Sequence, residues 1–272
     1  MEQWMSSVSQ WTWWLFFMVA LQASASVGHH LARLQADGSG LRDGRSEVSS
    51  IQTTVLGLLA LLLGFTFAMA GQRFEERKLL IRDEANGLGT LSLRIQLLPE
   101  ERRPRVTQLL LHYTETGLAL QREGFDPDHL RAHHAHAGQL QAQLWAEAMA
   151  VATVNPESET VSLFVSALNQ VIDLHGMQIA AFQNRIPAAV SVLLFVVSLV
   201  ALGLAGYASS LPRKQRVVLM FLLSFLFSSV MLLTIDLHRP SRGLVTVSVR
   251  SLEEVRDSLQ QAAKMSELER RL

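Results

Sequence analysis

The sequence predicts an all-α integral membrane protein with four transmembrane helices and a central helical soluble domain. Three observations lead to this fold class. Hydrophobic residues make up 49% of the 272 residues and charged residues only 18%, an apolar balance for a soluble protein. Four segments are apolar over the thickness of a bilayer. Between the second and third of them, apolar residues recur with the period of a helix.

The four apolar segments are long enough to cross a membrane as helices. A span needs about 20 apolar residues, because the hydrocarbon core is about 30 Å thick. Each segment contains a charge-free stretch, and an ionised residue at mid-bilayer costs about 2.5–3.5 kcal/mol on insertion scales. The predicted spans are about Trp11–Val27, Val48–Gln72, a segment between Arg185 and Arg213, and Val217–Ile235.

The first span has an alternative interpretation as a cleaved signal peptide, because Ala23-Ser24-Ala25 is typical of a cleavage site. A signal peptide, however, begins with basic residues. This chain begins with the acidic Glu2 and has no Lys or Arg before the apolar segment. The tryptophans near its start suit an interfacial anchor, so we expect a retained span.

The central soluble domain is predicted to consist of helices separated by proline- and glycine-containing turns. Apolar positions at spacings of three and four predict one helix from Phe74 to Leu98, as a direct continuation of the second span. Pro99 is expected to end it. Further helices are predicted after Pro104, over Asp128–Thr153, and from Glu159 toward Arg185 with Ser158 as the N-cap.

The remaining segments complete the predicted organisation. The loop Ala32–Glu47 is rich in Gly, Asp and Ser and is predicted to be irregular. Leu244–Val249 alternates as a short strand does, and a charged helix is expected over Ser251–Leu272. The predicted divisions are residues 1–72 with two spans, 73–185 as the soluble domain, 186–237 with two spans, and 238–272 as a C-terminal motif and helix.

Composition and motifs exclude several functions. Basic and acidic residues balance at 24 each, whereas a general nucleic-acid-binding protein needs a basic excess. The chain has no cysteine, which excludes disulfides, thiolate metal sites and cysteine nucleophiles. Phosphate-binding loops, nucleophile elbows, zinc-protease motifs and dinucleotide fingerprints are absent from the sequence. We therefore expect neither an enzyme nor a cofactor.

Histidines cluster in the middle of the soluble domain. His129, His133 and His136 lie at i, i+4 and i+7 on one face of a predicted helix, with His134 beside them. Two imidazoles four residues apart can bind zinc or nickel, and histidine titrates near pH ~6.5, which permits pH sensing. No carboxylate or cysteine joins them at a familiar metal-site spacing. We therefore favour a solvated polar helix and predict no metal site.

The second span carries two overlapping patterns. Gly57, Gly64 and Gly71 recur every seven residues, and glycine lets a neighbouring membrane helix approach closely. Gly57, Leu61 and Phe65 recur every four residues and share one face. If several copies of the chain gather around an axis, this face lines a hydrophobic constriction, which can gate by dewetting. Ordinary packing of membrane helices is the alternative.

Charged residues follow the second span directly. Arg73, Arg77 and Glu84 lie near one side of the continuing helix, and Glu76 is placed to pair with Arg73. We interpret these four residues as the charged mouth of a pore or as structural ion pairs. The alternative is a solvated helix whose basic residues anchor it at the lipid headgroups.

The end of the fourth span predicts a structural clasp. Asp236 lies where a lone carboxylate needs a partner, and Arg239 follows three residues later. Pro240 ends the helix, and Gly243 permits the chain to reverse. We interpret Asp236, Arg239, Pro240 and Gly243 as an Asp–Arg clasp that anchors the exit of the span.

Two of these motifs resemble those of a known family. They are the stretch LLGFTFAMAGQRFEERKLLIRDEANGLGT, with Gly64-Phe65 and Arg73-Phe74, and the tail LTIDLHRPSRGLVTVS. Both are similar to the bestrophin-like domain family of bacterial membrane proteins, which is distantly similar to bestrophin anion channels. The four-span layout with a central helical block agrees with that family, and the resemblance covers most of the chain.

Bestrophins are pentameric anion channels whose second span lines a hydrophobic neck, and the resemblance implies the same arrangement here. Carried over by position, Phe65 matches a neck aromatic, Leu61 a neck aliphatic residue and Gly57 the third neck position. The sequence departs from the pattern in two places. Glycine offers no gate side chain, and the double aromatic after the arginine is reduced to Phe74-Glu75.

The hypothesis that follows is a homo-oligomeric, bestrophin-like anion channel in a bacterial inner membrane, with membrane lipid and anions as partners. The alternative is a non-conducting membrane scaffold or sensor that binds a partner through its helical domain. Basic residues are almost balanced between the two ends of the spans, so the positive-inside rule does not decide the orientation. The resemblance favours a cytoplasmic soluble domain.

Overall fold

The computed structural model describes residues 10–34, 41–123, 127–184, 187–209, 211–237 and 249–269. Within these ranges every regular element is helical, which confirms the all-α prediction. The chain divides into two compact units. The first consists of Met1–Gln72 and Arg185–His238, and the second of Arg73–Asn184 and Arg239–Leu272.

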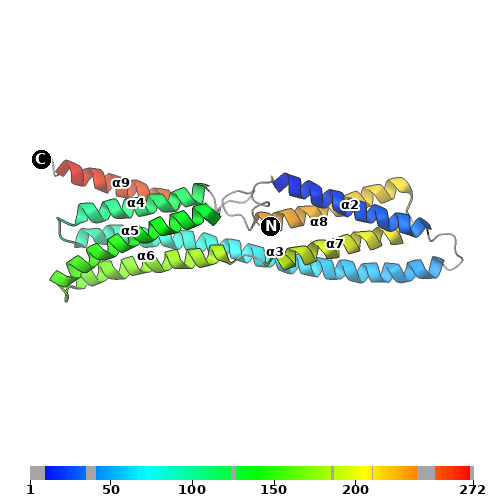
Figure 1. Ribbon diagram of the computed structural model, residues 1–272, viewed down its shortest axis with the longest axis horizontal. Coiled ribbons are helices and arrows are strands. Elements are labelled where there is room, and N and C mark those ends of the chain that lie inside the picture. The colour runs from blue at the N-terminus through cyan, green and yellow to red at the C-terminus, as the bar shows by residue number, and fades with distance from the viewer. Residues whose placement is uncertain are drawn as a thin grey trace. The chain divides into compact units, whose positions relative to one another are not determined.

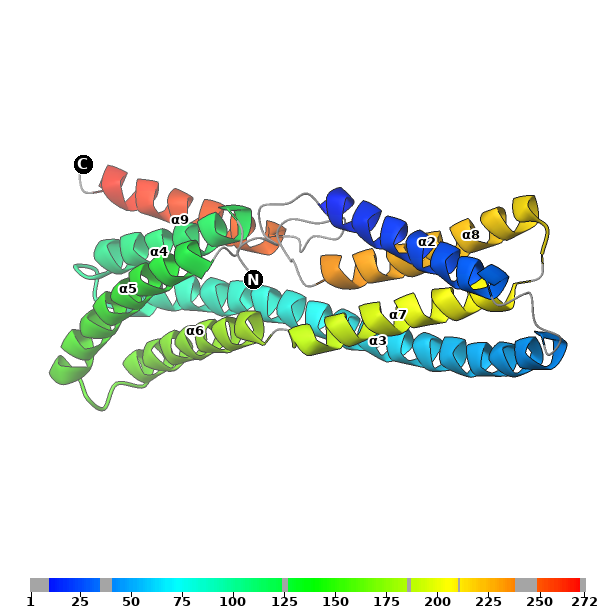
Figure 2. The same ribbon diagram turned by 45° about the vertical axis from the view of Figure 1, so that its right-hand side comes forward.

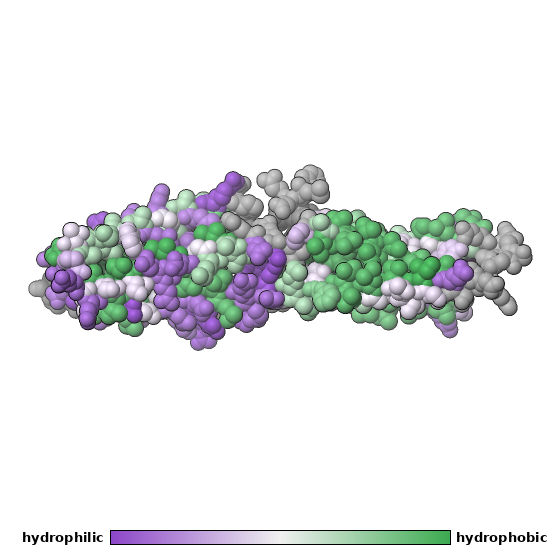
Figure 3. All heavy atoms as spheres, turned by 90° about the horizontal axis from the view of Figure 1, so that it is seen from below, coloured by the Kyte–Doolittle hydropathy of each residue, from purple (hydrophilic) through white to green (hydrophobic). Residues whose placement is uncertain are grey.

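The first unit holds helices that are long and apolar enough to cross a membrane, as the sequence predicts. These helices are α2 (Gln10–Leu34), the first part of α3 (Leu41–Arg94), α7 (Ala188–Ala208) and α8 (Arg213–Asp236) (Figure 1). Their buried side chains form one apolar core. Figure 3 shows that hydrophobic residues cover much of the visible face of this unit, as contact with lipid tails requires.

Helices α2 and α7 pack closely because small residues face each other. A Cβ atom added to Gly28 would collide with the carbonyl oxygen of Gly203, and one added to Gly206 would collide with that of Ala25. Ser24 Oγ donates a hydrogen bond to the carbonyl oxygen of Leu199 at 2.6 Å. Small residues permit such backbone contact between membrane helices.

The glycines of the second span do not make this kind of contact within the chain. A Cβ atom added to Gly57, Gly64 or Gly71 would meet no atom of another element within 4 Å. Among the described residues, close backbone contact of this kind occurs between α2 and α7, through residues that are more than 170 positions apart in the sequence. Close contact of the α3 glycines with a neighbouring helix stays a prediction.

The second unit is a helical bundle that begins with the continuation of α3. A single 3-10 turn, Ile95–Leu97, ends that helix. Helices α4 (Arg103–Glu123), α5 (Pro127–Val154), α6 (Glu159–Gln183) and α9 (Arg250–Glu269) follow (Figure 2). Apolar side chains from α3, α4, α5, α6 and α9 meet in one core. Helix α4 lies between α5 and α9 and packs against both.

Several helix boundaries follow the sequence signals. The side chain of Ser158 accepts a hydrogen bond from the backbone of Val161 at 3.4 Å, which confirms it as the N-cap of α6. Helix α3 is one uninterrupted helix that contains both Phe65 and Leu80. Its α-helical part ends at Arg94, four residues before the predicted end, because the last turn tightens to 3-10 geometry.

The connecting segments contain more helix than the sequence predicts. Most of the loop predicted over Ala32–Glu47 is helical, because α2 continues to Leu34 and α3 begins at Leu41. Gly and Asp lower helix stability without forbidding the helix. The predicted strand lies almost entirely outside the described residues, and its last residue, Val249, has no regular structure.

Candidate pore-lining face and charged residues of helix α3

Within the first unit, helix α3 has one packed face. Leu59, Leu63, Thr66 and Ala70 follow one another at spacings of four, three and four, and their exposed fractions are 0%, 6%, 7% and 1%. Leu59 and Leu63 pack into the core with residues of α2, α7 and α8. The chain's own membrane helices therefore cover this side of α3.

The opposite face of α3 carries the three predicted constriction residues. A helix turns by about 100° per residue, which places Gly57, Leu61 and Phe65 roughly 160–240° away from Leu59. Leu61 is 54% exposed and Phe65 is 65% exposed, and Gly57 is exposed as well. The structure brings these residues together on one uncovered stripe of the single chain.

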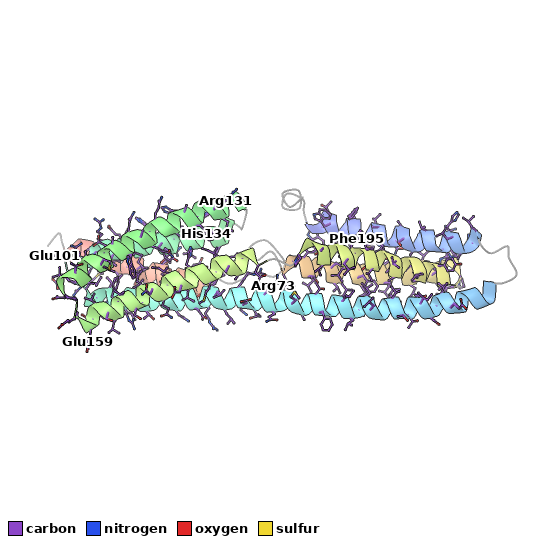
Figure 4. All side chains as sticks on the ribbon, turned by 60° about the horizontal axis from the view of Figure 1, so that its bottom comes forward. Arg73, Glu101, Arg131, His134, Glu159 and Phe195 are labelled. Atoms are coloured by element: carbon purple, nitrogen blue, oxygen red, sulfur yellow. The ribbon has the colours of Figure 1, made fainter. Side chains whose placement is uncertain are left out.

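The charged residues that follow α3's apolar part belong to the second unit. Arg73, labelled in Figure 4, donates a hydrogen bond from Nη1 to the carbonyl oxygen of Asn184 at 2.9 Å. This acceptor is the C-cap of α6, where helix carbonyls carry partial negative charge. The bond replaces the pairing with Glu76 that the spacing predicts. Arg77 is only 4% exposed, whereas Glu76 is exposed.

Glu84 lies in the core of the second unit, at 5% exposure. Tyr113 donates to its Oε1 at 2.9 Å, and Gln178 donates to its Oε2 at 2.6 Å. Neither partner is an arginine, because the helix turns Glu84 toward α4 and α6. Glu84 therefore belongs to a buried polar layer of the bundle, and its interpretation as part of a pore mouth or as a structural ion pair stays a prediction.

The same layer contains two histidines. His175 Nδ1 lies 3.9 Å from Glu84 Oε1, and the rings of His134 and His175 meet edge-on with centroids 5.5 Å apart. Figure 4 places His134 on α5. His136 is exposed, and the side chain of His129 lies outside the described residues. Among described side chains, no group of three or more His, Cys, Asp or Glu residues is arranged to hold a metal ion.

The predicted clasp at the end of α8 is described only at its first residue. Asp236 is the last residue of α8 and is fully buried within the first unit. Arg239, Pro240 and Gly243 lie outside the described residues. The anchoring role of this motif therefore stays a prediction.

Sequence reasoning missed the residues that hold the charged side chains in place. Tyr113, Gln178 and Asn184 are 29, 94 and 111 positions from the residues they bond. Their types are ordinary for helices, and none stands in a recognisable motif. They can be identified only once the packing of the helices in the bundle is known.

Solved structures of a bacterial bestrophin homologue from Klebsiella pneumoniae are similar to this chain. The structure solved by Zn-SAD phasing superposes with a TM-score of 0.68 at 14% sequence identity, covering 93% of this chain and 98% of that one. Two point variants give TM-scores of 0.70 and 0.72 at 14% and 15% identity, covering 92% and 95% of this chain and 98% of theirs. At such identities the likeness is one of fold.

A comparison with curated proteins gave no match. A family model described as a bestrophin-like domain, by contrast, matches residues 18–252. That match spans most of the chain and includes the uncovered stripe of α3, the charged residues after it and the end of α8. The chain therefore belongs to the bestrophin-like family.

Proposed function

We propose that the chain is the subunit of a homo-oligomeric anion channel whose hydrophobic constriction is the uncovered stripe of α3. One observation carries the proposal. Gly57, Leu61 and Phe65 lie opposite the packed face of α3 and stay exposed in the single chain. In a bestrophin-like assembly, the second span is the helix that surrounds the axis. The residues that the single chain leaves exposed are therefore available to face this axis.

The chemistry of the stripe suits a gate. Leucine and phenylalanine side chains around a narrow axis exclude water unless the opening is wide, so a ring of them controls conduction by dewetting. Glycine at position 57 adds no side chain to the ring. The narrowest point is therefore expected at Leu61 and Phe65.

Positive charge after the constriction supports selectivity for anions. Basic groups near a pore raise the local concentration of anions. Arg73 is the better candidate for this role, because part of its side chain stays exposed while Arg77 is buried. We assign Arg77 to the packing of the second unit. The exposed carboxylate of Glu76 partly offsets the positive charge of Arg73.

For orientation, we propose a bacterial inner membrane with the second unit in the cytoplasm. The basic residues directly after the apolar part of α3 support it, because cytoplasmic flanks of spans carry an excess of Lys and Arg. These residues are Arg73, Arg77, Lys78 and Arg82. Reporter fusions at either terminus of the full chain test the orientation.

Cysteine accessibility tests the lining directly, since the chain has no cysteine of its own. Leu61→Cys and Phe65→Cys are reconstituted in vesicles and exposed to a charged thiol reagent that needs water at its target. Val192→Cys, on α7 and 60% exposed, is the control for a lipid-facing position. Because cysteine is smaller than leucine or phenylalanine, each substitution widens the ring in every copy and admits water, so we expect modification at Leu61 and Phe65 alone. Equal protection at all three positions contradicts an aqueous path along the stripe.

The oligomeric state in detergent separates the channel from the alternative function. An axis lined by α3 requires several copies, five if the assembly follows bestrophins. A particle mass of one or two chains contradicts the channel and favours a non-conducting scaffold or sensor. Mass photometry or single-particle imaging of the full chain supplies this measurement.

A further inference from the structure

The second unit contains a small pocket that the channel proposal does not use. Helices α3, α4, α5 and α6 line it, and most of the residues around it are of polar or titratable types. The lining residues are Glu84, Tyr113, Thr116, Gly117, Leu120, Gln121, His133, His134, Ala137, His175 and Gln178. Within it, Glu84 accepts hydrogen bonds from Tyr113 and Gln178, as buried polar groups normally do.

His134 is the unmatched member of this lining. Both of its ring nitrogens are buried and have no hydrogen-bond partner. A neutral imidazole has one donor and one acceptor, and each costs free energy when it is buried unpaired. The ring therefore faces the pocket without a bond that fixes its protonation state.

The groups that face His134 come from every helix around the pocket. His175 of α6 lies against its ring, with centroids 5.5 Å apart. Glu84 of α3 lies 3.9 Å from His175 and is held by Tyr113 of α4. His133 lines the same pocket from α5 itself. When His175 carries a proton, it can pair with the Glu84 carboxylate, whereas no carboxylate among the described side chains lies within bonding distance of His134.

We propose that this pocket is a proton-binding site, at which protonation of His134 loosens α5 from the bundle as the pH falls below about 6.5. The inference does not depend on conduction. It assigns the second unit a pH response that is built from buried groups. The loosened segment is the part of α5 that carries His134, Ala137 and Leu140, whose side chains face the bundle.

The direction of the response follows from linkage. Burial, and then the charges of His175 and His133, lower the pKa of His134 below its ordinary value. The unfolded or loosened chain restores the ordinary value, so it binds the proton more readily. The packed His134 therefore makes its full contribution to the free energy of unfolding above about pH 6.5. That contribution is lost as the pH falls toward the pKa of His134 in the folded chain. One such proton changes the opening equilibrium by up to about tenfold per pH unit.

Thermal unfolding of the full chain in detergent gives the first test. The wild type is compared with His134→Gln, which cannot be protonated, and with His136→Gln, an exposed histidine of the same helix. We expect the midpoint of the wild type and of His136→Gln to fall by several degrees between pH 7.5 and 5.5. The fall should be clearly smaller for His134→Gln. Equal falls in all three proteins overturn the proposal.

A labelling experiment keeps the proposal testable if His134→Gln does not fold. Ala137 is 4% exposed and lines the pocket, whereas Ala135 on the same helix is exposed. The rate of thiol modification at Ala137→Cys, divided by that at Ala135→Cys, removes the effect of pH on the reagent and the thiol. We expect this ratio to rise several-fold from pH 7.5 to 5.5. A constant ratio overturns the proposal.

Discussion

Tyr113 and Glu84 form a buried hydrogen bond of 2.9 Å that ties α4 to α3 inside the second unit. Gln178 of α6 completes the coordination of the carboxylate at 2.6 Å. One carboxylate therefore connects three helices of the bundle. Such a layer fixes the rotation of each helix about its axis, because apolar contacts alone tolerate sliding.

Removing the phenol tests the contribution of this bond. Tyr113→Phe keeps the ring and leaves Glu84 without one donor, so we expect a loss of about 1.5–3 kcal/mol in the free energy of unfolding. Denaturant unfolding of the full chain in detergent measures it. Glu76→Gln, at an exposed position of α3, is the control and should change little. An unchanged stability for Tyr113→Phe contradicts the role given to the bond.

The ionisation of Tyr113 gives a second prediction. Burial, and then the neighbouring Glu84 charge, raise the pKa of Tyr113 well above its ordinary value. Tyr113 therefore makes its full contribution to the free energy of unfolding below about pH 10, and that contribution is lost as the pH rises toward the pKa of Tyr113 in the folded chain. Absorbance near the tyrosinate band, recorded on Tyr207→Phe so that Tyr113 is the remaining tyrosine, should show no ionisation until the bundle unfolds. A titration near pH ~10 in the folded chain speaks against the buried bond.

The end of the bundle near the α3–α4 turn depends on Glu147. Its carboxylate is 9% exposed, accepts a hydrogen bond from Arg102 at 2.8 Å and forms an ion pair with Arg105 at 2.6 Å. Glu147→Gln should lower the free energy of unfolding by about 1–3 kcal/mol. Glu100→Gln is the matched control, because Glu100 is 89% exposed and lies 3.9 Å from its arginine. An exposed pair contributes about 0–1 kcal/mol, so equal effects from the two variants refute the distinction.

Close packing of α2 against α7 predicts an asymmetric effect of adding a methyl group. Gly28→Ala forces the two backbones apart and should destabilise the first unit by about 1–3 kcal/mol or more. Gly64→Ala meets no neighbour within the chain and should be neutral or stabilising, because alanine favours a helix over glycine. Thermal unfolding in detergent compares the two. A tolerated Gly28→Ala contradicts the observed crossing.

The spans and most helices of the second unit could be predicted from the sequence because their signals are local. Uncharged runs identify the spans, and Ser158 lies directly before the helix it caps. The uncovered stripe with Leu61 and Phe65 also follows from helical spacing, since residues four apart share a face. Its role at an axis does not follow, because that depends on neighbouring copies.

Tertiary partners could not be predicted in the same way. The histidine pattern groups His133 with His129 and His136, yet His134 is the residue whose nitrogens are buried without a partner. The sequence predicts a solvated polar helix there, and one residue changes the facing direction by about 100°, so His134 faces the bundle on the same helix as the exposed His136. The partners of Glu84 could not be predicted for a related reason, because Tyr113 and Gln178 lie on helices far away in sequence.

The most direct test of the channel is anion flux through vesicles reconstituted with Phe65→Ala, compared with the wild type and with Phe67→Ala. Phe67 is also an exposed aromatic of α3, at 39%. Phe67 lies two residues after Phe65, which places it about 200° around the helix from Phe65 and away from the proposed constriction. The account predicts that Phe65→Ala raises anion flux while Phe67→Ala leaves it at the wild-type level. Absence of flux from both the wild type and Phe65→Ala, in vesicles shown to contain folded protein, would contradict it.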